Sequence, residues 1–177
     1  MNEPRGKGTI PTPHPVLVGV CRNQHPEVVA TAARLAVALK LDLVCAYAVT
    51  GLESSEWKAK AIIDFETLGR DAQEEIGVTV VRELQAGLGA ALQDSPVRWI
   101  LRILVGAPAG ALEECASALG ASLLVLGSPI RRPFGSTSAR LRASTLARLL
   151  SHRTVPVLVV PPQPSPGKTD TPYLPMP

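Results

Sequence analysis

Residues 97–127 read VRWILRILVGAPAGALEECASALGASLLVLG, and this stretch decides the fold class. In its first part, 97–105, the apolar residues Val97, Trp99, Leu101 and Ile103 alternate with positions that include Arg98 and Arg102, as in a β-strand with one face partly wet. Gly106 and a proline end that strand, 109–120 has the pattern of a short helix that ends in glycine, and 122–127 is a second apolar strand. Strand, helix and strand in this order predict two parallel strands joined by a right-handed crossover.

The same alternation continues in both directions along the chain. Further strand patterns lie at 15–20 (PVLVGV), 41–49 (LDLVCAYAV) and 155–161 (VPVLVVP), helical patterns lie at 26–40, about 71–92 and 138–151, and 50–69 is a less regular piece expected to cover the sheet. Every crossover is long enough for a helix, which predicts one α/β domain with an open, mostly parallel, five-stranded sheet and helices on both faces. The domain is expected over 15–161, between flexible tails at 1–14 and 162–177 that are rich in proline, glycine and threonine.

The composition supports this class and limits the partners. The 177 residues are 46% hydrophobic but only 3% aromatic, so the core has to be built from Val, Leu, Ile and Ala, as in strands that helices cover on both faces. The formal net charge of +3, from 18 basic and 15 acidic residues, is too small to predict nucleic acid as a partner. One late segment without acidic residues could still attract an anion, because it contains Arg131, Arg132, Arg140, Arg142, Arg148 and Arg153.

The three cysteines are Cys21, Cys45 and Cys115. Each lies in an apolar run, and their odd number and wide spacing predict buried, reduced thiols rather than disulfides or a metal site. The N-terminal stretch lacks the apolar core of a signal peptide, and no apolar run approaches the roughly 20 residues of a membrane span. We therefore expect a cytoplasmic protein that makes no membrane contact.

The loop after the fourth strand carries the parts of a phosphate site. Parallel sheets bind ligands at the carboxyl ends of their strands, where the winding direction reverses. Residues 127–136 read GSPIRRPFGS, in which glycines let backbone N–H groups approach phosphate oxygens and Arg131 and Arg132 would neutralise the charge. The alternative is that Gly127 only permits the turn, that a serine of the loop only caps the next helix, and that both arginines are solvated. The residues leave both interpretations open.

Four segments are specific when taken together: PVLVGV, AARLAVALKLDLVCAYAV, VGAPAGALEECASALGASLLVLGS and VPVLVV. With them, the chain resembles the universal stress protein family over nearly all of residues 15–161. The resemblance implies a Rossmann-like fold of the adenine nucleotide alpha hydrolase type, with strand order 3-2-1-4-5, and a homodimer. The last strand, Val155 to Val160, is expected to lie at the sheet edge and to pair with the same strand of a second copy. The alternative is an edge that the proline-rich tail protects.

In nucleotide-binding members, the resemblance implies an ATP site, which Mg²⁺ enters only together with ATP. The site is built from an Asp after the first strand, backbone near the end of the second, and a loop patterned Gly-x-x-Gly-x9-Gly-Ser/Thr after the fourth. Gly127 and Ser128 match the start of that loop. The residues expected in this site are Cys21, Ala48, Gly106, Gly127, Ser128, Arg131, Arg132, Gly135, Ser136, Ala143 and Ser144.

Some positions depart from the family pattern. Cys21 stands where nucleotide-binding members have the Asp, and a thiol cannot accept hydrogen bonds from ribose hydroxyls as a carboxylate does. Ile130 occupies the second glycine position of the loop, and Ala143 occupies the last. The longer spacing resembles a subgroup whose loop reads GSRRPGFRGS-x6-GS. Under that alignment, Gly135 and Ser136 supply an additional glycine turn. Position 143, which is alanine here, is then the one position where the glycine of the pattern is lost.

Three functional hypotheses follow. The first is a dimeric stress-response regulator that binds an adenine nucleotide and is not an enzyme, because the histidines are isolated and no pair of carboxylates shares a site. The second is a family member that no longer binds nucleotide and acts as a dimeric interaction module through protein contacts alone. The third is a slow ATPase in which Arg131 or Arg132 stabilises the phosphate, although no candidate base supports it.

Overall fold

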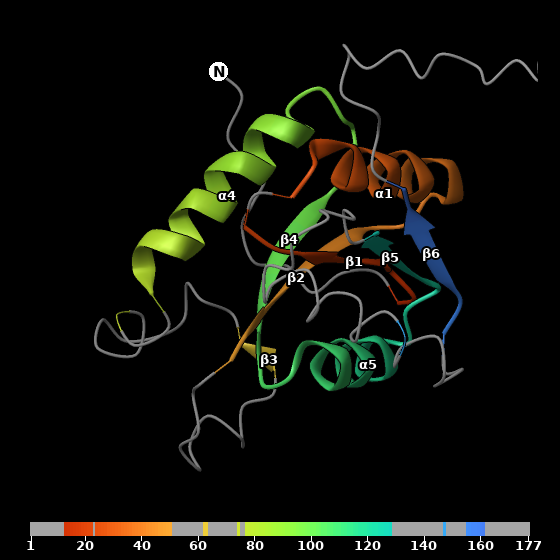
Figure 1. The fold of residues 1–177 in the computed structure, drawn as a ribbon. Coiled ribbons are helices and arrows are strands. Elements are labelled where there is room, and N and C mark those ends of the chain that lie inside the picture. The colour runs from red at the N-terminus through yellow and green to blue at the C-terminus, as the bar shows by residue number, and fades with distance from the viewer. Residues whose placement is uncertain are drawn as a thin grey trace, which may run out of the picture.

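The computed structural model describes residues 13–22, 24–50, 62–63, 74, 77–128, 147 and 155–161. Its elements are labelled in Figure 1. In chain order they are β1 (Val16–Val20), α1 (Pro26–Leu39), β2 (Leu43–Val49), β3 (Ile62–Ile63), α4 (Val78–Leu92), β4 (Trp99–Val105), α5 (Pro108–Leu119), β5 (Leu123–Gly127) and β6 (Val157–Val160).

The strands form one sheet of order β3-β4-β2-β1-β5-β6. All neighbouring strands are parallel except β3, which runs antiparallel to β4. The parallel strands follow the order 3-2-1-4-5 when they are counted along the chain, which confirms the predicted sheet. Within the segment 50–69, which was expected to cover the sheet, Ile62 and Ile63 instead form a strand that extends the sheet beside β4.

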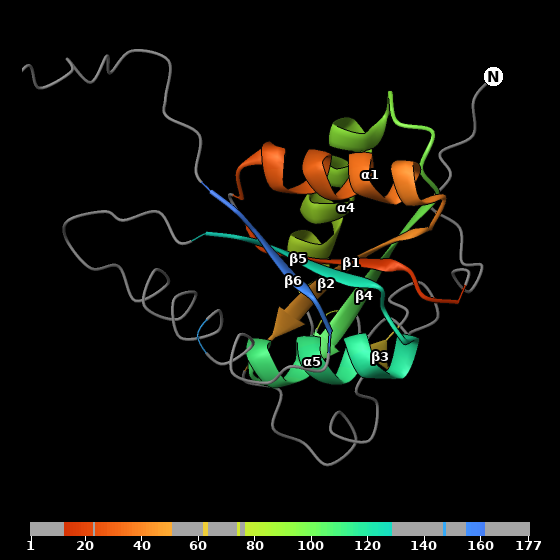
Figure 2. The same ribbon diagram turned by 90° about the vertical axis from the view of Figure 1, so that its right-hand side faces the viewer.

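Helices cover the sheet on both faces, as predicted. Figure 2 shows α1 and α4 on one face and α5 on the other. Along β1, Val16, Val18 and Val20 belong to the core cluster on the α1 and α4 face, whereas Leu17 belongs to the cluster on the α5 face. All four side chains are buried. Because both faces of the central strands are buried, their sequences read as continuous apolar runs.

Local signals fix the helix ends. The α1 helix begins at Pro26, and Nδ1 of the N-cap residue His25 accepts a hydrogen bond from a first-turn N–H at 3.3 Å. It ends at Leu39, and the C-cap residue Lys40 adopts the left-handed conformation at φ 57°. The α4 helix spans Val78–Leu92, and Gly77 at φ 98° interrupts the helix that was expected from about residue 71. This φ lies in the region that favours glycine.

Several predicted segments lie outside the described residues. They are most of the tails, most of 50–69, most of the stretch from 71 to 76, the predicted phosphate loop after Ser128, and the helix at 138–151, of which Ala147 is described and is helical. None of the helices within the described ranges has the length and apolar content that crossing a bilayer requires.

Candidate functional site

The winding direction of the sheet reverses at β1, which pairs with β2 on one side and with β5 on the other. Open α/β sheets bind ligands in the crevice at the carboxyl ends of the strands beside such a reversal. Val18 lies beside Val125 in the parallel register, so Val20 and Gly127 follow at the carboxyl ends of the two strands. The structure therefore brings Cys21, the residue after β1, and Gly127 to the same end of the sheet, as the sequence predicts.

Gln24 holds the loop at this end of β1, and it is not among the site residues that the sequence predicts. Its Oε1 accepts a hydrogen bond from the Cys21 N–H at 2.8 Å, and its Nε2 donates to the Gly19 carbonyl at 3.3 Å. The same Nε2 lies 3.8 Å from the point where a Cβ on Gly127 would be. The Gln24 amide therefore lies in the crevice between β1 and β5. The only sequence signal for Gln24 is its position in the polar turn CRNQHPE, and this signal is weak.

Packing alone explains why position 127 is a glycine, and no ligand is needed to account for it. A Cβ at this position would lie 3.0 Å from Cγ2 of Val28, so the glycine lets the first turn of α1 approach β5. Its φ is not in the left-handed region. Ser128 is also used within the fold, because its N–H donates to the Val160 carbonyl at 2.8 Å. The Ser128 N–H is therefore engaged by β6 and is not a donor for a phosphate in this structure.

Ala48 and Gly106 lie at the same end of the sheet as Cys21 and Gly127, near the carboxyl ends of β2 and β4. Ala48 pairs with Leu104 and packs against the core cluster on the α5 face. Gly106 follows β4 at φ 125°, a conformation that favours glycine, and its N–H donates to the Val49 carbonyl at 2.9 Å. The turn into α5 thus requires Gly106 whether or not a ligand binds. The other predicted site residues lie outside the described residues: Arg131, Arg132, Gly135, Ser136, Ala143 and Ser144.

The three cysteines differ in exposure. Cys45 and Cys115 are buried in the two core clusters, whereas Cys21, which was expected to be buried, is partly exposed at the crevice. Burial raises the pKa of the Cys45 thiol far above its ordinary value, and burial raises the pKa of Cys115 to about 11. Both remain protonated at neutral pH. Cys21 is therefore the cysteine placed to meet a ligand.

The described residues define an α/β protein of the Rossmann-like class, with a crevice where the strand order reverses. The model of the universal stress protein family matches residues 13–161. The chain therefore belongs to the universal stress protein family, as the sequence resemblance implied.

Solved structures of universal stress proteins have the same fold. One from Archaeoglobus fulgidus has a TM-score of 0.59 at 16% identity, with 82% of this chain and 97% of that chain covered. A universal stress protein in complex with cAMP has a TM-score of 0.57 at 24% identity, with coverage of 86% and 98%. The Archaeoglobus fulgidus protein in complex with dAMP has a TM-score of 0.56 at 16% identity, with coverage of 82% and 96%. No curated protein matches the sequence at a significant level.

Proposed function

We propose that this universal stress protein is a cytoplasmic, non-catalytic regulator that binds an adenine nucleotide at the carboxyl ends of β1 and β5. The observation that carries the proposal is the convergence of Cys21, Gln24 and Gly127 at the strand reversal. Similar structures in complex with cAMP and dAMP support the choice of an adenine nucleotide.

Gln24 would take the part of the family's Asp after the first strand. Its amide both donates and accepts, so it can bind ribose hydroxyls once it releases the Cys21 N–H and the Gly19 carbonyl. Each hydrogen bond released costs about 0.5–1.5 kcal/mol, which makes nucleotide binding weak. Arg131 and Arg132, on the loop beyond the described residues, are the proposed partners of the phosphate, and Mg²⁺ would enter with ATP.

Adenine nucleotides are expected to raise the melting temperature. A ligand that binds only the folded state stabilises it by RT ln(1 + [L]/Kd), about 2.7 kcal/mol when the ligand is at 100 times Kd. We expect millimolar AMP, cAMP, or ATP with Mg²⁺ to raise the melting temperature in a thermal shift assay. Cys21→Asp restores a carboxylate beside the ribose and is expected to tighten binding about tenfold, because a charge-assisted hydrogen bond is stronger than one to an amide.

The matched control is Gly110→Ala in α5, where a Cβ meets no atom within 4 Å, and it is expected to leave nucleotide affinity unchanged. A melting temperature that millimolar nucleotide does not change, in both the natural chain and Cys21→Asp, would contradict nucleotide binding. That result would favour the module that acts through protein contacts alone. Phosphate release above the buffer blank, lost in Arg131→Ala, would instead support the slow ATPase.

We further propose that two copies pair through Val155–Val160. Among the described strands, β6 ends the sheet opposite β3 and pairs with β5 on one side. Pairing with β6 of a second copy would use its other row of backbone groups. Size-exclusion chromatography with light scattering is expected to give twice the mass of the chain. The mass of a single chain at every concentration would contradict this pairing.

A further inference from the structure

A cleft of about 370 Å³ lies between α1 and α4, at the end of β1. Both helices cover the face of the sheet opposite α5 (Figure 2). The cleft shares Cys21 and Gln24 with the crevice at the strand reversal, and α4 supplies a further wall that the crevice lacks. Its volume lies in the range of small-molecule sites, about 300–1,000 Å³. It is therefore large enough for a small ligand and too small for a folded partner.

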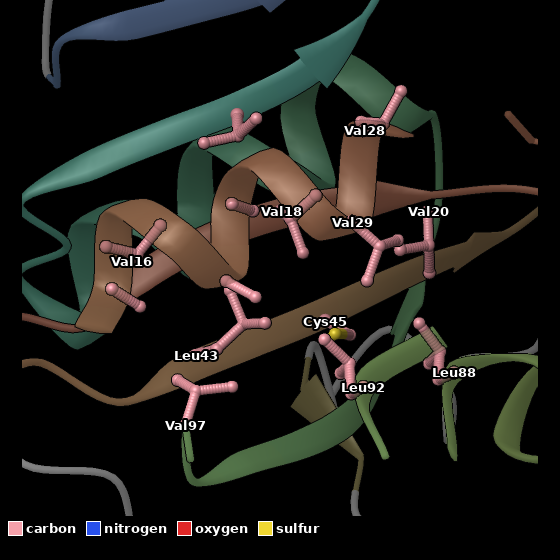
Figure 3. Packing of buried hydrophobic residues seen from close by; sticks show 14 of the residues in the cluster. Val16, Val18, Val20, Val28, Val29, Leu43, Cys45, Leu88, Leu92 and Val97 are labelled. Atoms are coloured by element: carbon pink, nitrogen blue, oxygen red, sulfur yellow. The ribbon is translucent and has the colours of Figure 1, made fainter. Parts of the chain in front are cut away.

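The floor of the cleft is apolar and belongs to the core. Val20 from β1, Val29 from α1 and Leu88 from α4 line it and are 7%, 6% and 4% exposed. Figure 3 shows these three side chains together at one end of the core cluster. On the α4 wall, Gly87 and Ala91 have no bulky side chains, which keeps the space open. An apolar group of a ligand would be well buried on this floor.

The rim carries one charge of each sign. Arg22, in the turn after β1, donates from Nη2 to Oε2 of Glu83 in α4 at 3.2 Å. The two side chains are 58% and 57% exposed, so water screens the pair and it contributes little to stability. The pair can therefore rearrange around a ligand at little cost. The Arg22 guanidinium has five N–H donors, enough to hold a carboxylate in addition to Glu83.

From this combination we propose that the cleft binds a free α-amino acid with a large apolar side chain. Arg22 binds the carboxylate of the ligand, Glu83 binds its ammonium group, and the side chain lies on the apolar floor. A ligand with a single charge would meet one attractive and one repulsive group, because the two protein charges are only 3.2 Å apart. A zwitterion satisfies both. The proposal needs no bound nucleotide, although the cleft shares Cys21 and Gln24 with the proposed nucleotide site.

The first test uses L-phenylalanine as the probe, with isothermal titration calorimetry on the full chain. Two analogues each lack one charge: 3-phenylpropionate has no ammonium group, and 2-phenylethylamine has no carboxylate. We expect each analogue to bind at least tenfold more weakly than L-phenylalanine. Equal affinities for the three compounds, or no binding heat at millimolar L-phenylalanine, would overturn the proposal.

The second test fills the cleft. Gly87→Phe is expected to weaken L-phenylalanine binding at least tenfold, because the new ring occupies the space beside Leu88. Gly89→Phe is the matched control on the same helix, and Gly89 does not line the cleft. A Cβ at either glycine meets no atom within 4 Å, so both variants should fold, which thermal melting verifies. Unchanged affinity in Gly87→Phe, or equal losses in both variants, would overturn the proposal.

The third test separates ligand recognition from a structural role of the ion pair. Arg22→Gln removes the partner of the carboxylate, so L-phenylalanine and 2-phenylethylamine should then bind within about twofold of each other. Glu83→Gln should do the same for L-phenylalanine and 3-phenylpropionate. If the ion pair had only a structural role, each substitution would weaken the binding of all three compounds equally and leave the order of their affinities unchanged. That result would contradict the assigned roles.

Discussion

Gly19→Val is expected to lower the free energy of unfolding by about 3 kcal/mol. Gly19 lies in β1, which has β2 and β5 as neighbours on its two sides. A Cβ at this position would lie 2.8 Å from Cδ2 of Leu126 and 3.2 Å from Cδ1 of Leu112. Both leucines are buried in the core on the α5 face, so neither can move away without disturbing close packing. The valine methyl groups would add to this overlap.

Urea denaturation measures this change, and Gly110→Val is its matched control. Gly110 lies in α5, where a Cβ meets no atom within 4 Å. Valine and glycine differ in helix propensity by only about 0.5 kcal/mol. The midpoint of urea unfolding of this control should therefore be close to that of the natural protein. If Gly19→Val were as stable as Gly110→Val, the close approach of Leu112 and Leu126 to β1 would be wrong.

Leu17→Ala is expected to lower the free energy of unfolding by about 3–5 kcal/mol. Leu17 is fully buried between the sheet and α5, in the same cluster as Leu104, Leu112 and Leu124. Removing its side chain loses apolar burial and leaves a cavity, because the neighbouring strands hold the cluster in place. Thermal and urea denaturation should both show the loss. Globular domains have only about 5–15 kcal/mol of stability, so the variant would be close to unfolding.

The control for this prediction is Leu39→Ala, at the end of α1. Leu39 is 52% exposed, and its truncation should change stability by no more than about 0.5 kcal/mol. Similar losses in the two variants would mean that burial on the α5 face is not what makes Leu17 important.

Most of the fold could be predicted from the sequence, because each central strand is buried on both faces and therefore has a continuous apolar sequence. The runs 15–20, 41–49 and 122–127 all contain strands of the sheet. The β3 strand could not be predicted, because two residues are too few to show a hydrophobic periodicity. The position of Ile62 and Ile63 depends on their pairing with β4. Likewise, the residue at which α4 begins depends on Gly77 at φ 98°, which no periodicity reveals.

The site could be predicted less well than the fold. Topology alone places Cys21 and Gly127 at one end of the sheet, because parallel strands end at the same edge. The part of Gln24 could not be predicted, since its hydrogen bonds depend on how the turn after β1 folds back. The contact of Val28 with Gly127 is also tertiary, so the sequence could not separate a packing glycine from a ligand-binding one. The roles of the residues outside the described ranges stay predictions: Arg131, Arg132, Gly135, Ser136, Ala143 and Ser144.

The two-residue strand β3 has a consequence for how copies of this protein can join. It runs antiparallel to the rest of the sheet and ends the described part of the sheet on the β4 side. A strand this short offers almost no template for another chain. If two copies join as proposed, through the β6 edge of each, one such junction uses both β6 edges. Assembly by this route stops at a closed pair and does not grow into a filament.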